Sequence, residues 1–169
     1  MLLAPRRVWK HLSGGARALR VGALDHVCVC VSDVDRSIAW YGGVLGLALQ
    51  HADHPAFGKD PAFMEGEGGA RVALLPLPRG ASPVADHKGA HFALGVAALA
   101  DFEAVAAELP AALAAHRACA AQSIEVDEQD YGLQRSLFFA DPDSNIVEIT
   151  CWVHGGGGGG GGGGSSNVT

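Results

Sequence analysis

The segment from Ser136 to Trp152 constrains the fold of this chain more than any other. Its apolar run is interrupted once, by Asp141-Pro142-Asp143-Ser144-Asn145. Proline presets φ in a tight turn, and Asp, Ser and Asn side chains can hydrogen-bond to their own backbone. We therefore predict a strand over 136–140, an acidic turn, and a strand over 146–152. Because side chains alternate along a strand, Glu148 shares one face with Ile146, Thr150 and Trp152.

Glu148 is a lone carboxylate among apolar neighbours. Burial of an unpaired charge is costly, so this side chain needs a cation, a hydrogen-bond network or a solvent-filled cavity. A bound metal ion is one way to meet that need.

Two histidines could complete such a site. His26 and His91 each lie near the start of a short β-type run, and the same-face neighbours of both are small. Two imidazoles and one carboxylate with open positions suit divalent Fe, Mn, Zn or Ni. We predict a metal site formed by His26, His91 and Glu148, and we interpret the other histidines as surface residues.

The predicted elements occur twice in the same order. The first set is a strand over 24–31, a helix from Ser32-Asp33 to Gly46, a strand over 47–51, and a hairpin of strands 62–65 and 70–77. After a polar linker at 78–88, the second set comprises a strand at 90–96, a helix over about 99–119, and strands at 124–126, 136–140 and 146–152. Pro110 predicts a kink or break in the second helix.

Three separated motifs carry a resemblance to a known family. Asp25-His26-Val27, His91-Phe92-Ala93-Leu94 and the segment 141–148 resemble the vicinal oxygen chelate superfamily, which includes glyoxalase I, extradiol dioxygenases and fosfomycin or bleomycin resistance proteins. The resemblance covers roughly residues 23–153. It implies an α+β fold of two tandem βαβββ modules, about 23–77 and 89–153, forming an incomplete barrel around one cup-shaped metal site. It also implies pairing of modules within one chain or between two chains of a homodimer.

The chain departs from its relatives at the groups that move protons. By the repeat, Leu74 is the first-module counterpart of Glu148, and a leucine can neither ligate a metal nor carry a proton. Where extradiol enzymes have a His and a Tyr, this chain has Tyr131 and Phe138. Tyr131 is our candidate catalytic residue, although a phenol with a pKa of about 10 is a poor base at neutral pH.

The resemblance therefore implies three kinds of function. The first is a metal-dependent enzyme of glyoxalase or dioxygenase type, acting as a lyase, isomerase or ring-cleaving dioxygenase on a small oxygen-rich molecule. The alternative is a non-catalytic small-molecule-binding protein of the bleomycin-resistance kind. A third is a degenerate module kept for assembly or regulation. A fosfomycin-resistance reaction would need cations to hold the phosphonate, for which the candidates are Arg71, Arg79, Lys88 and Arg135.

Composition narrows the partners and the compartment. The 169-residue chain has a formal charge of −6 without a Lys/Arg cluster on a predicted face, which argues against nucleic acid. No apolar run is long enough to predict a membrane span. The four cysteines lack a C-x-x-C pair, which favours reduced thiols in an intracellular protein. Residues 1–22 form a basic leader, disordered or targeting, that leaves cytoplasm and organelle open. We expect the Gly-rich tail at 154–169 to be disordered.

Overall fold

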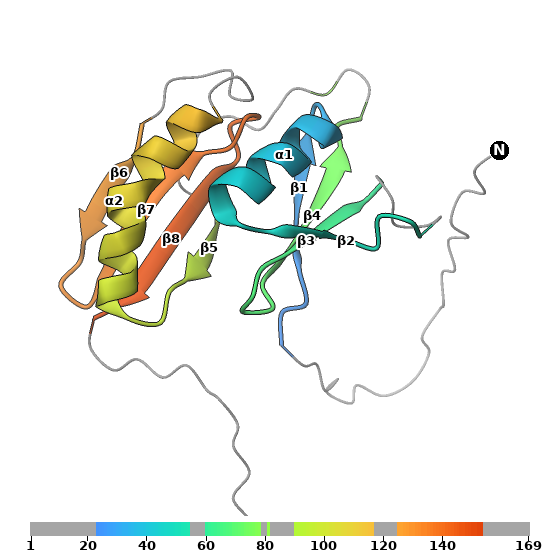
Figure 1. Cartoon of the computed structure of the whole chain (residues 1–169). Coiled ribbons are helices and arrows are strands. Elements are labelled where there is room, and N and C mark those ends of the chain that lie inside the picture. The colour runs from blue at the N-terminus through green and yellow to red at the C-terminus, as the bar shows by residue number, and fades with distance from the viewer. Residues whose placement is uncertain (1–22, 55–59, 79–80, 82–89, 117–124, 154–169) are drawn as a thin grey trace, which may run out of the picture.

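Two four-stranded sheets and two helices make up the computed structural model, which describes residues 23–54, 60–78, 81, 90–116 and 125–153 (Figure 1). The first sheet has the order β1 (Val27–Val31), β4 (Arg71–Pro76), β3 (Ala62–Glu65) and β2 (Ala48–Gln50). The second has the order β5 (His91–Gly95), β8 (Ile146–Trp152), β7 (Gln134–Ala140) and β6 (Asp127–Asp130).

Both sheets follow the same plan. β1 runs parallel to β4 and β5 runs parallel to β8, whereas the other paired strands are antiparallel. The predicted α+β fold of two βαβββ modules is confirmed, and the two described sheets do not close into a barrel. The leader at 1–22, the tail at 154–169, the linker residues 82–89 and the predicted end of the second helix after 116 lie outside the described residues.

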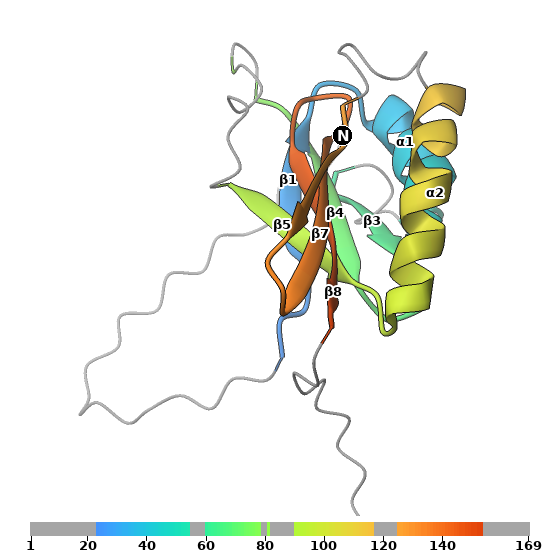
Figure 2. The same ribbon diagram turned by 90° about the vertical axis from the view of Figure 1, so that its left-hand side faces the viewer.

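The helices begin and end for local reasons. α1 (Val34–Leu45) is capped by Asp33, whose side chain accepts a hydrogen bond from the N–H of Arg36, and it ends at Gly46 in the left-handed region, with φ of 66°. α2 (Leu99–Ala115) continues through Pro110 as a single helix, so the predicted break is absent. Both helices lie on the same side of the two sheets (Figure 2).

The hydrophobic core lies between the helices and the sheets. Alternate strand residues face it, so the sheets have a helix face, toward α1 and α2, and an open face on the other side. The helix face of β8 carries Val147, Ile149 and Cys151, which pack in the core cluster with Trp40 and Phe102. Glu148 and Thr150 therefore lie on the open face. Among the described residues, no helix combines the length and hydrophobicity needed to cross a bilayer.

The predicted strand at 124–126 was misplaced. β6 spans Asp127–Asp130, an edge strand of four polar residues that pairs antiparallel with β7. Charged side chains on an edge strand oppose pairing with another chain.

The acidic turn ties the two modules together. Asp141 Oδ1 accepts hydrogen bonds of 2.8 Å from the N–H groups of Asp143 and Asn145, which fixes the turn itself. Asp143 Oδ2 then lies 2.8 Å from Arg36 Nη2, and Asn145 Nδ2 donates to the carbonyl oxygen of Cys30 at 3.1 Å. The turn of the second module is thus bonded to β1 and α1 of the first.

Candidate functional site

His91 and Glu148 face each other on the open face. The two atoms His91 Nε2 and Glu148 Oε2 are 2.9 Å apart. The strands explain this contact, because β5 and β8 are paired with Ala93 directly opposite Glu148, and the small side chain of Ala93 leaves room for the carboxylate to reach the imidazole. Glu148 is 6% exposed, so its charge is held almost entirely by neighbouring groups.

Ser136 satisfies the other oxygen of this carboxylate. Its Oγ donates a 2.6 Å hydrogen bond to Glu148 Oε1, and the serine is fully buried. Ser136 Oγ also lies 3.2 Å from Thr150 Oγ1, which accepts a 2.8 Å hydrogen bond from Gln134 Nε2. A row of polar side chains from β7 and β8 therefore fixes the orientation of Glu148 and leaves Oε2 toward His91.

His26 lies across a cavity from His91. Both histidines line one cavity of about 320 Å³ between the starts of β1 and β5. His26 Nδ1 lies 2.7 Å from Asp25 Oδ1. This hydrogen bond, assisted by the nearby Arg71 guanidinium, lowers the pKa of the Asp25 carboxyl below its usual value. With Nδ1 engaged by Asp25, Nε2 is the His26 nitrogen left to meet a ligand.

The three predicted metal ligands are therefore only partly assembled. His91 and Glu148 are in contact, whereas His26 is held by Asp25 on the other side of the cavity. Within the described ranges, no three His, Cys, Asp or Glu side chains are grouped closely enough to hold one metal ion.

The two histidines occupy equivalent positions in the repeat. The His26 ring meets Phe63 edge-on at 5.1 Å between centroids, and the His91 ring meets Phe138 in the same way at 5.6 Å. Phe63 is paired with Ala73, and Phe138 is paired with Glu148.

Ala73 is therefore the counterpart of Glu148, and the predicted counterpart, Leu74, is wrong by one residue. A shift of one residue moves a side chain to the other face of a sheet, and Leu74 is indeed fully buried in the core on the helix face. The conclusion drawn from it still holds, because Ala73 also has no ionisable group.

Tyr131 lies away from the histidine pair. It begins the turn between β6 and β7, and its N–H bonds to the carbonyl of Gln134, the residue paired with Trp152 at the end of β8. Trp152 is four residues from Glu148, or about 13 Å along a strand. Tyr131 is 58% exposed. The structure does not bring it together with His91 and Glu148, and its catalytic role stays a prediction.

The sequence of this chain matches the model of a known protein family. Residues 23–149 match the model of the Glyoxalase/Bleomycin resistance protein/Dioxygenase superfamily. The chain belongs to this superfamily. No match to a curated protein was found.

Solved structures of this superfamily share the fold. The chain is similar to a glyoxylase/bleomycin resistance protein/dioxygenase domain from Frankia sp. EAN1pec, with 22% identity, a TM-score of 0.62, and coverage of 81% of this chain and 96% of that one. It is also similar to a glyoxalase/dioxygenase from Nostoc punctiforme, with 19% identity, a TM-score of 0.59, and coverage of 82% of this chain and 99% of that one. The third similar structure is the fosfomycin resistance protein FosX from Mesorhizobium loti, with 19% identity, a TM-score of 0.53, and coverage of 80% of this chain and 96% of that one. At these identities the similarity shows the fold alone.

A divalent metal, which members of this superfamily commonly use, fits the donor types on the open face. An imidazole nitrogen and a carboxylate oxygen 2.9 Å apart are two ligands such ions accept, and a second imidazole lines the same cavity. Sequence reasoning missed Ser136, which holds the carboxylate. The signal was present, because a turn at 141–145 sets the hairpin register and places Ser136 diagonally beside Glu148 on the same face.

Proposed function

We propose that this protein is a divalent-metal-dependent enzyme of the superfamily, acting on a small oxygen-rich molecule bound at the open face. The observation that carries the proposal is the buried Glu148 carboxylate, which lies 2.9 Å from His91 Nε2, together with a cavity that His91 and His26 both line. Two imidazoles from equivalent places in the two modules, together with one carboxylate from the second module, are a donor set suited to one ion.

Each residue of the proposed site would have a distinct role in holding the ion. His91 and Glu148 would hold the ion, and His26 would complete the set from β1. A bound divalent ion supplies Lewis-acid chemistry, in which substrate oxygens are polarised and developing negative charge is stabilised. Ser136 fixes one carboxylate oxygen, so that the other keeps its direction. Phe63 and Phe138 restrict the rotation of the two imidazoles.

The open face offers room for a small substrate beside these ligands. A second cavity of about 360 Å³ runs between β1 and β5, with Cys28 and Cys30 on one side and His91 and Asn145 on the other. Its volume suits a small metabolite. Tyr131, in the turn between β6 and β7, would need to approach the ligands in order to donate a proton; a bound water would be the alternative proton carrier.

A phosphonate substrate of the fosfomycin type is less well supported. Of the cations considered for it, Arg79 and Lys88 lie outside the described residues. Arg135 is paired with Cys151 across β7 and β8 and its guanidinium stacks over Phe102, so it belongs to the helix face. Arg71 is engaged by Glu65 and Asp25.

Metal content tests the proposal directly. We would measure bound metal by elemental analysis, after purification without added metal and after reconstitution with Fe(II), Mn(II), Zn(II) or Ni(II). We expect about one ion per chain, lost in His91→Ala and Glu148→Gln and weakened in His26→Ala, because each variant removes a ligand. The matched control is His54→Ala, which deletes an imidazole in the β2–β3 connection. Absence of metal after reconstitution, or equal metal content in all variants, would contradict the proposal.

A metal-independent binding protein is the second candidate. The observation in its favour is that both oxygens of Glu148 already meet protein groups, Ser136 and His91. A site of this kind would bind its small-molecule ligand with an affinity that a chelator does not change, whereas the enzyme proposal expects the affinity to fall when metal is removed.

A further inference from the structure

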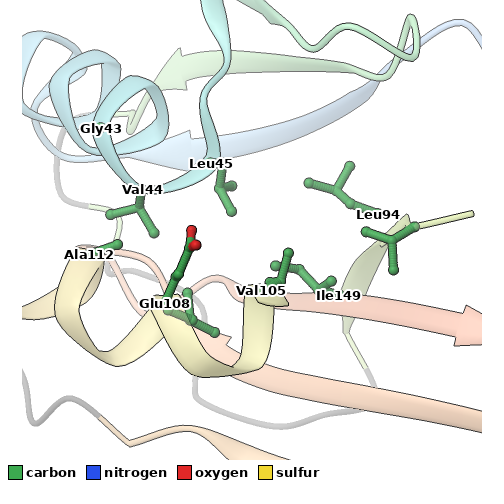
Figure 3. Close-up of a pocket in the computed structure, with 10 residues that line it drawn as sticks. Gly43, Val44, Leu45, Leu94, Val105, Glu108, Ala112 and Ile149 are labelled. Carbon is green, nitrogen blue, oxygen red and sulfur yellow. The ribbon is translucent and has the colours of Figure 1, made fainter. Parts of the chain in front are cut away.

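A cavity of about 360 Å³ lies on the helix face, apart from the histidine pair (Figure 3). It opens between α1 and α2 over β5 and β8. Its walls are aliphatic, with Val44 and Leu45 from α1, Val105 from α2, and Leu94 and Ile149 from the strands. The volume falls within the range of small-ligand sites, which are mostly apolar with a few placed polar groups.

Among the residues that the structure describes, Glu108 is the only charged one that lines this cavity. Figure 3 shows its carboxylate extending from α2 toward Val44 and Leu45, in the space between the helices. In the part of the chain that the structure describes, no basic side chain forms an ion pair with it. Glu108 is an exposed residue, so its carboxylate can meet a cation while the aliphatic part of the same ligand lies against the cavity walls.

Gly43, which lines the cavity, also lies against the end of α2. A Cβ built on Gly43 would lie 2.0 Å from His116 Cε1, so the imidazole at the end of α2 rests directly on the backbone of α1. The Gly42-Gly43 pair, which weakens a helix, is thereby explained: Gly43 lets α2 approach.

We propose that this cavity binds a small ligand with an aliphatic body and a protonated amine. The aliphatic walls take the body out of water, and the Glu108 carboxylate receives the ammonium group. An anionic ligand of the same length would place its charge against Glu108 and is excluded. The site is separate from the histidine pair, because Ile149, which lines it, lies in the core on the helix face of β8, whereas the neighbouring Glu148 lies on the open face.

The probes for the test are octylammonium, octanol and octanoate, which share a chain and differ in charge. Binding to the full chain is measured by calorimetry, and the location of the bound probe by NMR contacts to Ile149 and Val105. We expect octylammonium to bind more tightly than octanol, and octanoate to bind least. Glu108→Gln should weaken octylammonium about two- to fivefold and leave octanol unchanged, because the paired charge that is lost is an exposed one.

Glu103→Gln is the matched control, since it removes the same charge from α2 at a carboxylate that faces Arg135 instead. Ala112→Leu should fill the cavity and weaken all three probes; if this variant does not fold, Glu108→Gln alone decides. Three results would overturn the proposal: octylammonium binding no better than octanol, an equal effect of Glu103→Gln and Glu108→Gln, or loss of binding in His91→Ala.

Discussion

Tyr41 Oη donates a 2.9 Å hydrogen bond to Asp141 Oδ2, and this bond joins the first helix of one module to the acidic turn of the other. Tyr41 is fully buried and Asp141 is 4% exposed. Burial raises the pKa of the Asp141 carboxyl above its usual value, against the hydrogen bonds from Asn145, Tyr41 and the N–H of Asp143. The phenol is therefore one of the few groups that compensate a buried charge.

Tyr41→Phe should destabilise the fold by about 1.5–3 kcal/mol, because it removes a hydrogen bond to a buried charged group. The free energy of unfolding from urea denaturation measures the effect. Tyr131→Phe, at an exposed position, serves as the control and should change stability little. Equal stability of Tyr41→Phe and the unmodified chain would show that the bond contributes nothing.

The same contact predicts how alkaline pH acts on the protein. Burial, followed by the charge of Asp141, raises the pKa of Tyr41 well above 10.0. Because the pKa of Tyr41 is higher in the folded state than in the unfolded state, the protonated phenol contributes its full stabilisation below pH 10. This contribution is lost as the pH rises toward the folded-state pKa.

We therefore expect stability to fall above pH 10 more steeply in the unmodified chain than in Tyr41→Phe. Absorbance of tyrosinate in Tyr131→Phe, where Tyr41 is the remaining tyrosine, should appear only together with unfolding. Tyrosinate that forms while the circular dichroism is still native would refute this.

Ser136→Ala should lower the affinity for a divalent ion about 10–100-fold, because groups that orient a metal ligand typically contribute that much. The measurement is calorimetric titration with Mn(II) or Zn(II). Thr150→Val is an informative control, since the Thr150 hydroxyl lies 3.2 Å from Ser136 Oγ, whereas Ser136 itself bonds to Glu148, and the effect of this variant should be smaller. Unchanged affinity in Ser136→Ala would mean that Ser136 does not position the ligand.

The effect of Gly43→Ala on stability should change sign when His116 is replaced by alanine. Alanine favours a helix over glycine by about 1 kcal/mol, but here its Cβ would overlap the His116 imidazole. We expect the substitution to destabilise the unmodified chain and to stabilise the His116→Ala variant, as measured by thermal unfolding of the four proteins of the cycle. The same sign in both backgrounds would contradict the close packing of α1 and α2.

The strongest local patterns in the sequence predicted the fold best. The strand at 146–152 was predicted with the bounds it has, because its apolar residues alternate around a well-defined turn. β6 was missed because Asp127–Asp130 contains no apolar residue, and only pairing with β7 makes it a strand. The break expected at Pro110 is absent because Leu109 and Leu113 hold that part of α2 against the core while Pro110 faces solvent.

The candidate site was predictable in its residue types and less so in its contacts. Sequence spacing identified His91 and Glu148, which the structure places 2.9 Å apart. It could not reveal that Asp25 holds His26, because that depends on side-chain rotamers at the start of β1. Leu74 was predicted to be the counterpart of Glu148 by counting along the repeat. That count was wrong by one residue, and one residue along a strand moves the side chain to the other face of the sheet. The pairing of Phe63 with Ala73 shows that Ala73 is the counterpart.

The bonds from the acidic turn to Arg36, Tyr41 and Cys30 join residues 100 to 115 positions apart in the chain. They are made by side chains inside the modules and would form whether or not one peptide connects the two halves. The two modules therefore contact each other as the subunits of a heterodimer do, although a single chain contains both. Gene fission at the linker, or exchange of halves with a duplicated copy, would preserve every one of these contacts.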